Sequence, residues 1–492
     1  MVVEQKELLK LCKQASQLIA ENAAAGKRIR LTSHLDADGL ASASILSLYL
    51  HRLNANFSVR IVQQLDDEVV RGDIFTIPAD LYLFADLGSG QKPLVKEYRA
   101  KNSEVIIIDH HQPSEAEDEH ILEVNPNLLG MDGSTETCGA TLSYLVAKQG
   151  QAVNGRESAL ACVGAIGDRL DRGEKRSFKG FNEEIFSEIS KGGQVVRTLG
   201  LCLFGFETRP VVKCLEYTTD PLLPGLTGSE SSSFAFMKKI GVEPVKDDHW
   251  RTLSELSESE LQRLTSSLVK YMISKGVRAL VAESLIGYVY TIRNEERGSP
   301  LRDVREYASL LNACGRLNRP GIGLAIAMGD RRQHYAEAQS LLLEYRKKIG
   351  GYMDWLTSTP TAIQRKGNIT CIFGHSKIDE KIIGTVTSIA LSSQLISEER
   401  PVLAFAQSEN GKIKVSSRVT SALLAKGVNL GAALKIAAEG VGGFGGGHPA
   451  AAGALIPEGS EADFVESVER TIDAQLIEPR SQEVEGNPQA AI

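Results

Sequence analysis

The chain has 492 residues, of which 42% are hydrophobic and 24% charged, and its formal net charge is −7. These values are ordinary for a soluble globular protein of two to four domains. No apolar run approaches the roughly 18 residues of a membrane-spanning helix. Glu4, Lys6 and Glu7 stand where a signal peptide would be apolar. We therefore expect a cytoplasmic protein without membrane contacts.

The net charge is distributed unevenly along the chain. Residues 456–492 hold nine acidic and two basic side chains, which accounts for the whole −7 and leaves the remainder neutral. Residues 361–455 carry ten Lys or Arg against six Asp or Glu, an excess that suits a nucleic-acid-binding face or an ordinary solvated surface. The seven cysteines include no Cys-x-x-Cys pair, which predicts reduced core thiols and no zinc framework.

The first part of the chain predicts a doubly wound, mostly parallel α/β sheet. Residues 1–27 have the apolar spacing of a packing helix. From residue 28 to about 180, apolar segments alternate with helical ones. Four apolar segments end in Asp or His, although the fourth, residues 161–168, suits a helix equally well. Their ends are His34-Leu35-Asp36-Ala37-Asp38-Gly39, Asp86-Leu87-Gly88, Asp109-His110-His111 and Gly167-Asp168.

These four ends predict a metal cluster. Ligands of open α/β sheets collect beyond the carboxyl ends of the strands, and mixed imidazole and carboxylate groups are metal ligands. An isolated Asp-x-Asp-Gly can be a simple turn, because Asp and Gly suit turns. Core packing does not explain four such ends that could meet in one crevice.

The second half of the chain predicts helices followed by another α/β unit. Residues 181–190 and 254–275 are helical in pattern, around a Pro/Gly/Ser-rich patch at 221–233. A long helix at 333–356 leads to a second unit, with strands near 369–373, 402–406 and 412–416 and helices near 381–395 and 429–438. A short amphipathic helix follows Pro457, and we expect disorder from about residue 480.

The four ordered motifs resemble those of the DHH phosphoesterase superfamily. Gly445-Gly446-Gly447-His448-Pro449-Ala450-Ala451-Ala452-Gly453 resembles the signature of its accessory DHHA1 domain. The segment Arg302–Arg316, which contains Asn312-Ala313-Cys314-Gly315-Arg316, resembles RecJ-type nucleases in the form seen in archaeal RecJ-like proteins. The resemblance implies a DHH domain (1–190), an inserted, mainly helical partner-docking domain (191–295), a clamp segment with a linker helix (296–358), a smaller α/β DHHA1 substrate-binding domain (359–475) and a disordered acidic tail (476–492).

The resemblance also implies roles for single residues. Six side chains would hold two divalent metal ions: His34, Asp36 and Asp86 the first, and Asp38, Asp86, His110 and Asp168 the second. Mn²⁺ suits imidazole with carboxylates better than Mg²⁺ does, and Mg²⁺ and Co²⁺ stay open. His111 would contact a phosphate or donate a proton, and Asp109 would orient its neighbours.

Substrate contacts are implied in both halves of the chain. Asn312 and Arg316 match a backbone clamp, and Arg418 matches a phosphate contact of the accessory domain. Gly446, Gly447 and His448 would form a glycine-rich loop that approaches a phosphate closely. Because phosphate contacts carry no sequence information, we expect little base specificity.

The activity implied by the resemblance is a metal-dependent exonuclease on single-stranded DNA or RNA in DNA replication or repair, with 5′→3′ digestion of DNA favoured. One alternative is a DHH phosphodiesterase of short oligonucleotides or cyclic dinucleotides, or a manganese pyrophosphatase. Another is a replisome scaffold like the inactive eukaryotic relative in the replicative helicase. A scaffold would have lost metal ligands, and small-substrate enzymes usually lack the large insert. A helicase-associated complex such as GINS is the implied partner of that insert.

Overall fold

The computed structural model describes residues 2–116, 118–150, 153–218, 221–393, 395–408 and 411–477. The chain divides into two compact units, residues 1–346 and 347–492, which are described here one at a time. The expected disordered tail lies outside the described residues from residue 478 on. Among the helices that the structure describes, none is long and apolar enough to cross a bilayer.

The first unit is built on a five-stranded sheet in which every pairing is parallel. Its order is β2–β1–β3–β4–β5, with β1 (Arg28–His34), β2 (Asn56–Val62), β3 (Leu81–Ala85), β4 (Glu104–Ile108) and β5 (Ile121–Val124). The strand order reverses between β1 and β3, and in open sheets of this order the ligand crevice lies at that point. The predicted doubly wound parallel sheet is confirmed.

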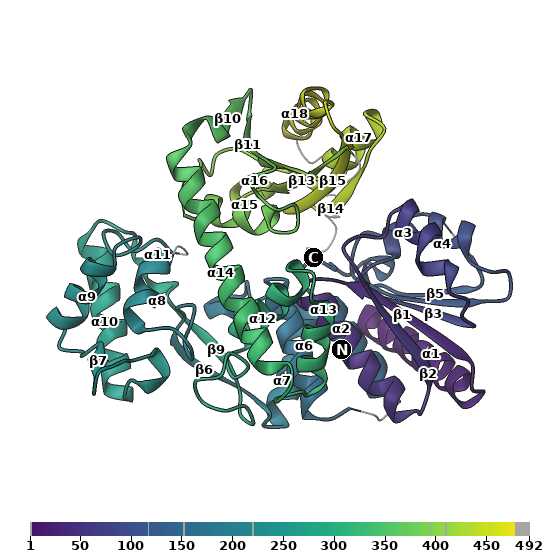
Figure 1. The fold of residues 1–492 in the computed structure, drawn as a ribbon, viewed down its shortest axis with the longest axis horizontal. Coiled ribbons are helices and arrows are strands. Elements are labelled where there is room, and N and C mark those ends of the chain that lie inside the picture. The colour runs from purple at the N-terminus through teal and green to yellow at the C-terminus, as the bar shows by residue number, and fades with distance from the viewer. Residues whose placement is uncertain are drawn as a thin grey trace, which may run out of the picture. The chain divides into compact units, whose positions relative to one another are not determined.

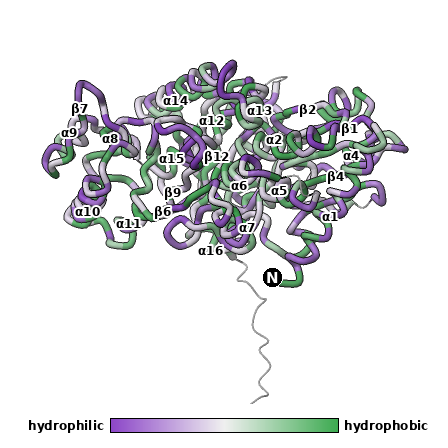
Figure 2. Tube along the Cα trace, turned by 90° about the horizontal axis from the view of Figure 1, so that it is seen from below, coloured by the Kyte–Doolittle hydropathy of each residue, from purple (hydrophilic) through white to green (hydrophobic). Residues whose placement is uncertain are grey.

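Helices cover both faces of this sheet (Figure 1). Apolar side chains of α3 (Asp67–Gly72) and α4 (Lys92–Tyr98) pack with Tyr82 and Phe84 on one face. The other face carries α1 (Val3–Ala24), α2 (Ala37–Arg52) and α5 (Gly139–Gln149). Burial on both faces explains the apolar sequences of β3 and β4. Figure 2 colours the chain by residue hydropathy, with β4 labelled.

The fourth apolar segment, which suited a strand or a helix, is the end of α6 (Gly155–Gly167). This helix packs against α2 and α5. Its glycines and alanines lie at those contacts: a Cβ added at Gly164 would lie 2.4 Å from the Cβ of Ala140. Close helix packing, and not a place in the sheet, is therefore the reason for its small residues.

A mainly helical insert follows α7 (Gly180–Lys191). The chain enters the insert through β6 (Val195–Leu201) and leaves it through β9 (Ile286–Ile292), and these two strands pair antiparallel. Between them, α8 (Val211–Tyr217), α9 (Glu230–Lys239), α10 (Glu258–Ser274) and α11 (Ala279–Glu283) contribute to a hydrophobic cluster of their own. The Pro/Gly/Ser-rich patch contributes Leu223 and Leu226 to this cluster, so part of it is packed core.

After the insert the chain continues through α12 (Val304–Arg316), α13 (Pro320–Met328) and α14 (Tyr335–Ser358). α12 packs against α2, α6 and α13, and α13 also packs against α2. The boundary between the two compact units falls within α14, the long helix that the sequence predicted.

The second unit is a six-stranded sheet in the order β10–β11–β12–β13–β15–β14. Its strands are β10 (Ile363–Lys366), β11 (Ile369–His375), β12 (Val402–Gln407), β13 (Lys412–Arg418), β14 (Phe444–His448) and β15 (Ala451–Pro457). The apolar faces of α17 (Leu430–Gly440) and α18 (Glu461–Ile477) pack on this sheet, and α15 (Ile383–Ser392) contacts β12 and β13. The predicted amphipathic helix after Pro457 is confirmed, because Phe464 and Val468 are fully buried.

The glycine-rich segment before His448 was expected to be a loop, and this prediction is wrong. It forms β14, which pairs antiparallel with β15 at the edge of the sheet. The glycines are needed for packing, because a Cβ at Gly445 would lie 2.6 Å from the carbonyl oxygen of Leu434 in α17. Gly447 has a φ of 133°, which a residue with a side chain rarely adopts.

Candidate metal centre

The six predicted ligands come together at the reversal point of the parallel sheet. They lie at the ends of successive elements: His34 ends β1, Asp36 caps α2, Asp38 lies in its first turn, Asp86 follows β3, His110 follows β4 and Asp168 caps α6. Two groups of side chains within this cluster, His34 with Asp36 and Asp86, and Asp38 with His110 and Asp168, have ligand atoms close enough to hold a metal ion.

The first group consists of His34, Asp36 and Asp86. His34 Nδ1 lies 3.1 Å from Asp36 Oδ2 and 3.7 Å from Asp86 Oδ2. Burial opposes protonation of His34, but the two carboxylates outweigh it and raise the His34 pKa to about 10. Burial alone would raise the pKa of Asp36, but the His34 charge outweighs burial and lowers this pKa.

The second group surrounds His110. Its Nε2 lies 3.3 Å from Asp86 Oδ1, 3.3 Å from Asp168 Oδ2 and 3.8 Å from Asp38 Oδ2. His110 Nδ1 is 2.8 Å from the carbonyl oxygen of Gly133, which can only accept a hydrogen bond. Nδ1 therefore carries the proton, and the other ring nitrogen is directed at the carboxylates as a ligand would be.

Asp86 lies between the two groups, because its Oδ2 is 3.7 Å from His34 Nδ1 and its Oδ1 is 3.3 Å from His110 Nε2. It is 2% exposed, and its φ of 61° is uncommon for a residue other than glycine. Its Oδ1 is buried and accepts no hydrogen bond from the described part of the chain. A strained residue with a buried carboxylate oxygen left to coordinate is what a bridging ligand requires.

The pKa values of the carboxyl groups support a cation at this site. Burial, together with the charges of Asp86 and Asp168, raises the pKa of Asp38 well above its ordinary value. Burial and the charges of Asp36 and Asp86 also raise the pKa of Asp168 to about 7, although His110 opposes this. Crowded carboxylates of this kind disfavour one another's ionisation unless positive charge balances them. The donor set therefore fits divalent cations.

Asp109 and His111 lie beside the ligands. The buried Asp109 carboxylate accepts hydrogen bonds from the backbone N–H groups of Ser89 (3.0 Å), His110 (2.8 Å) and His111 (3.2 Å). It also lies 2.7 Å from His111 Nδ1, and the ring of His111 is partly exposed. Burial alone would raise the pKa of Asp109. These partners outweigh burial and hold the pKa far below its usual range. Asp109 thus contacts the ring of His111 and the backbone N–H groups of both histidines.

Asn312 and Arg316 lie on α12 next to the metal loop, the segment His34–Gly39. Asn312 Oδ1 accepts a hydrogen bond from the backbone N–H of Ala37 at 3.3 Å. The Arg316 charge acts on Asp36 and lowers its pKa. Asn312 therefore contacts the loop that carries three of the predicted ligands, and Arg316 acts on one of them through its charge.

The remaining predicted contacts belong to the second unit. Arg418, at the end of β13, donates hydrogen bonds to the hydroxyl of Ser388 (2.8 Å) and the carbonyl oxygen of Ser417 (2.7 Å). Gly446, Gly447 and His448 lie in β14, and the register of the sheet pairs both His448 and Arg418 with Ala451.

Sequence comparisons identify the family. Models of the DHH family N-terminal domain, the DHH-CID domain and the DHHA1 domain match residues 28–166, 203–286 and 367–474. Uncharacterized protein MJ0831 of Methanocaldococcus jannaschii is 30% identical over 454 residues, which cover 91% of this chain and 94% of that protein. The single-stranded-DNA-specific exonuclease RecJ of Thermus thermophilus is 30% identical over 142 residues, which cover 28% of this chain and 21% of RecJ. This chain is a RecJ-like member of the DHH/DHHA1 superfamily.

Solved structures share the fold of this RecJ-like protein. RecJ from Thermus thermophilus, in complex with Mn²⁺, matches with a TM-score of 0.56 and 20% identity over 94% of this chain and 55% of that chain. The RecJ-like chain thus spans about half the length of that nuclease. CDC45 from Entamoeba histolytica matches with a TM-score of 0.64 and 11% identity over 94% of this chain and 99% of that chain.

Sequence reasoning missed the residues that hold Asp38 in this RecJ-like protein. The backbone N–H groups of Gly139 and Ala140, in the first turn of α5, donate to its two oxygens at 2.6 and 2.9 Å. A Cβ at Gly139 would lie 2.6 Å from the Cβ of Asp86. Only glycine therefore lets the start of α5 come this close to Asp86. The only signal in the sequence is the glycine at the start of this helix. The partial positive charge of that helix end also favours a carboxylate there.

Proposed function

We propose that this protein is a metal-dependent exonuclease that hydrolyses phosphodiester bonds of single-stranded nucleic acid. The observation that carries the proposal is Asp86, a buried carboxylate that lies between two groups of metal-ligating side chains. Membership of a phosphoesterase superfamily, and the similarity to a RecJ described as a single-stranded-DNA-specific exonuclease, support the same activity.

Two bound divalent ions would supply a nucleophilic hydroxide and neutralise charge on the phosphate and the leaving oxygen. His34 and Asp36 would hold one ion, Asp38, His110 and Asp168 the other, and Asp86 both. Mn²⁺ suits these nitrogen and oxygen donors best, and Mg²⁺ and Co²⁺ are the alternatives. A RecJ of the same fold has been solved in complex with Mn²⁺.

The other residues near the ligands would bind and orient the substrate. Because His111 Nδ1 faces Asp109, Nε2 is the ring nitrogen that would meet a phosphate oxygen or a leaving group. Asn312 and Arg316, beside the metal loop, would hold the strand's backbone, and Arg suits this role because its planar group binds phosphate bidentately. In the second unit, Arg418, Gly446, Gly447 and His448 would contact further phosphates. Contacts of this kind predict little base specificity, and we favour 5′→3′ digestion of DNA, with RNA as a second substrate.

Digestion of end-labelled single-stranded DNA and RNA, with Mn²⁺ or Mg²⁺ and with both ends compared, tests this function. Asp86→Ala should abolish hydrolysis and remain folded, because only the bridging ligand is lost. Asp354→Ala, at an exposed position of α14, is the matched control and should cut normally. Full nuclease activity of Asp86→Ala would refute the two-metal centre.

The fold match to CDC45 favours one alternative, a replisome scaffold without catalysis. The complete set of six ligands speaks against it, since a scaffold has no need of crowded buried carboxylates. Failure of the wild-type protein to cut any single strand, in the presence of bound Mn²⁺, would favour the scaffold. Preferential hydrolysis of dinucleotides over long strands would favour the phosphodiesterase of short oligonucleotides.

We also propose that the insert, residues 191–295, docks a replicative-helicase complex such as GINS. Large apolar side chains are exposed on it, among them Leu280 (83%), Tyr217 (55%) and Trp250 (41%). Exposed apolar groups of this size mark interaction surfaces where they cluster. Leu280→Glu with Trp250→Glu should abolish co-purification with the complex and leave hydrolysis intact. The control is Ile77→Gln, which changes an apolar residue of similar exposure outside the insert. Retained co-purification of the double variant would contradict the docking role.

A further inference from the structure

α12 touches the metal loop at one end. A Cβ added at Gly315 would lie 1.7 Å from the carbonyl oxygen of Leu35, the residue between two ligands, so the helix backbone rests directly on the loop. One turn earlier, Asn312 accepts the hydrogen bond from Ala37 N–H. A movement of this end of α12 toward the loop would therefore displace the loop.

The other end of α12 holds the insert. The Glu306 side chain is fully buried, and its Oε1 accepts hydrogen bonds from the backbone N–H groups of Glu207 (2.8 Å) and Thr208 (3.2 Å). The Thr208 hydroxyl donates to the other carboxylate oxygen, and Arg346 Nη2 lies 3.4 Å from it. Glu207 and Thr208 follow β6, so this single carboxylate joins the outgoing chain of the insert to the first turn of α12.

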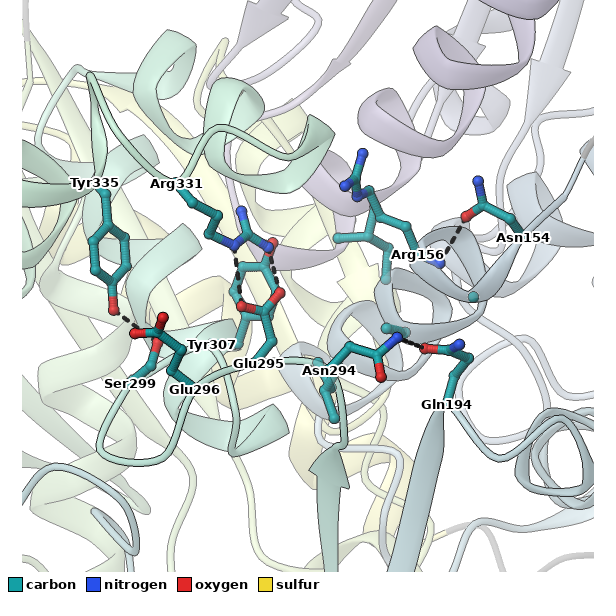
Figure 3. Close-up of a pocket in the computed structure, with 14 residues that line it drawn as sticks. Asn154, Arg156, Gln194, Asn294, Glu295, Glu296, Ser299, Tyr307, Arg331 and Tyr335 are labelled. Atoms are coloured by element: carbon teal, nitrogen blue, oxygen red, sulfur yellow. Dashed lines mark hydrogen bonds and ion pairs between the residues drawn. The ribbon is translucent and has the colours of Figure 1, made fainter.

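The returning chain of the insert reaches the same end of α12. The backbone N–H of Ile292 donates to the carbonyl oxygen of Arg302 at 2.8 Å, and Arg302 Nε lies 3.3 Å from Glu207 Oε1. Past β9, Glu295 pairs with Arg331, and the hydroxyls of Ser299 and Tyr335 lie 2.7 Å apart (Figure 3). A cavity of about 580 Å³, lined by these residues and by Tyr307 of α12, lies beside the returning chain.

A helix of this length transmits a displacement along its axis. The 13 residues of α12 span about 20 Å at 1.5 Å per residue. Its apolar side chains between the two ends are buried against neighbouring helices, and close-packed interiors of this kind transmit strain.

We propose that Glu306 is a positioning residue for the metal loop: by seating the insert on α12 it sets the placement of His34–Gly39, and with it the affinity of the first metal group. Docking on the insert would then change metal binding at the far end of the same helix. The inference rests on the metal centre of the proposed function, but it concerns Mn²⁺ binding and not the substrate.

Titration of the full-length, metal-free protein with Mn²⁺, by calorimetry, tests the inference. Glu306→Ala should weaken Mn²⁺ binding at least tenfold, while circular dichroism shows a folded protein. Glu306→Gln keeps an oxygen that can accept both N–H groups and should recover most of the affinity. Glu260→Gln breaks the Arg251–Glu260 pair inside the insert (2.8 Å) without touching α12, and should leave Mn²⁺ affinity within twofold of wild type.

Wild-type Mn²⁺ affinity in a folded Glu306→Ala protein would overturn the inference, as would an equal loss in Glu260→Gln. If Glu306→Ala does not fold, Thr208→Val decides: loss of the hydroxyl donor should weaken Mn²⁺ binding two- to fivefold, and an unchanged affinity would refute the role. A wild-type protein that binds Mn²⁺ but cuts no nucleic acid would contradict the proposed function alone.

Discussion

Gly164→Ala adds one methyl group at the centre of the metal site. A Cβ there would lie 2.3 Å from Asp38 Oδ1 and 2.4 Å from the Cβ of Ala140, closer than packed atoms allow. In an exposed helix interior the same change would stabilise by about 1 kcal/mol. Here overpacking costs about 1–3 kcal/mol, and displaced Asp38 loses charge-assisted hydrogen bonds worth about 1.5–3 kcal/mol each. We expect a net loss of about 2–4 kcal/mol in the free energy of unfolding.

Urea unfolding with and without Mn²⁺ measures this effect. Wild type should gain about 2.7 kcal/mol at a Mn²⁺ concentration one hundred times Kd, whereas Gly164→Ala should gain little, because Asp38 no longer fits a ligand position. Gly350→Ala, in α14, is the matched control: nothing lies within 4 Å of its added Cβ, so it should be neutral or slightly stabilising. A Gly164→Ala protein with wild-type stability and a full Mn²⁺ response would refute the packing argument.

Three further outcomes are expected. Burial and the Glu306 charge raise the pKa of the buried Asp303 to about 7, so its contribution to stability is present below about pH 4 and lost as pH rises to about 7. In urea unfolding, the free energy of unfolding of Asp303→Asn relative to wild type should therefore rise by up to about 4 kcal/mol across that window. Asp109→Asn should lower kcat by about 10²–10⁴ with KM little changed, because His111 loses its orienting carboxylate; an unchanged kcat would remove Asp109 from the mechanism. All seven cysteines are buried, so a thiol reagent should label them only on unfolding.

The parallel strands and the ligands could be predicted because their signals are local. A strand buried on both faces has a continuous β-branched sequence, as in Val105 to Ile108, and a ligand at its end follows directly in the chain. Residues 161–168 could not be assigned, because glycine and alanine suit a tightly packed helix and a buried strand equally. Only the contact of Gly164 with Ala140 and Asp38 resolves the choice, and that contact depends on the tertiary fold.

β14 shows the opposite limit. Three successive glycines present no side chains, so the alternation that marks a strand is absent from its sequence. The strand is held by its antiparallel pairing with β15, and α17 lies so close to it that Gly445 has no room for a Cβ. The N–H groups that hold Asp38 were missed for a related reason. Asp38 and Gly139 are 101 residues apart, and no local pattern in the sequence connects them.

The fold explains how this protein tolerates a cluster of buried carboxylates. Asp36 and Asp38 lie at the start of α2, and Asp38 also receives the first N–H groups of α5, so the partial positive charges of two helix ends offset part of the repulsion. The remaining repulsion, together with burial, raises the pKa values of Asp38 and Asp168. Divalent cations would relieve this repulsion, since they would replace protons on the carboxyl groups and coordinate the buried Oδ1 of Asp86. Metal affinity and fold stability would therefore be linked through the same side chains, and residues that contact the metal loop, such as Asn312 and Gly315, would contribute to both.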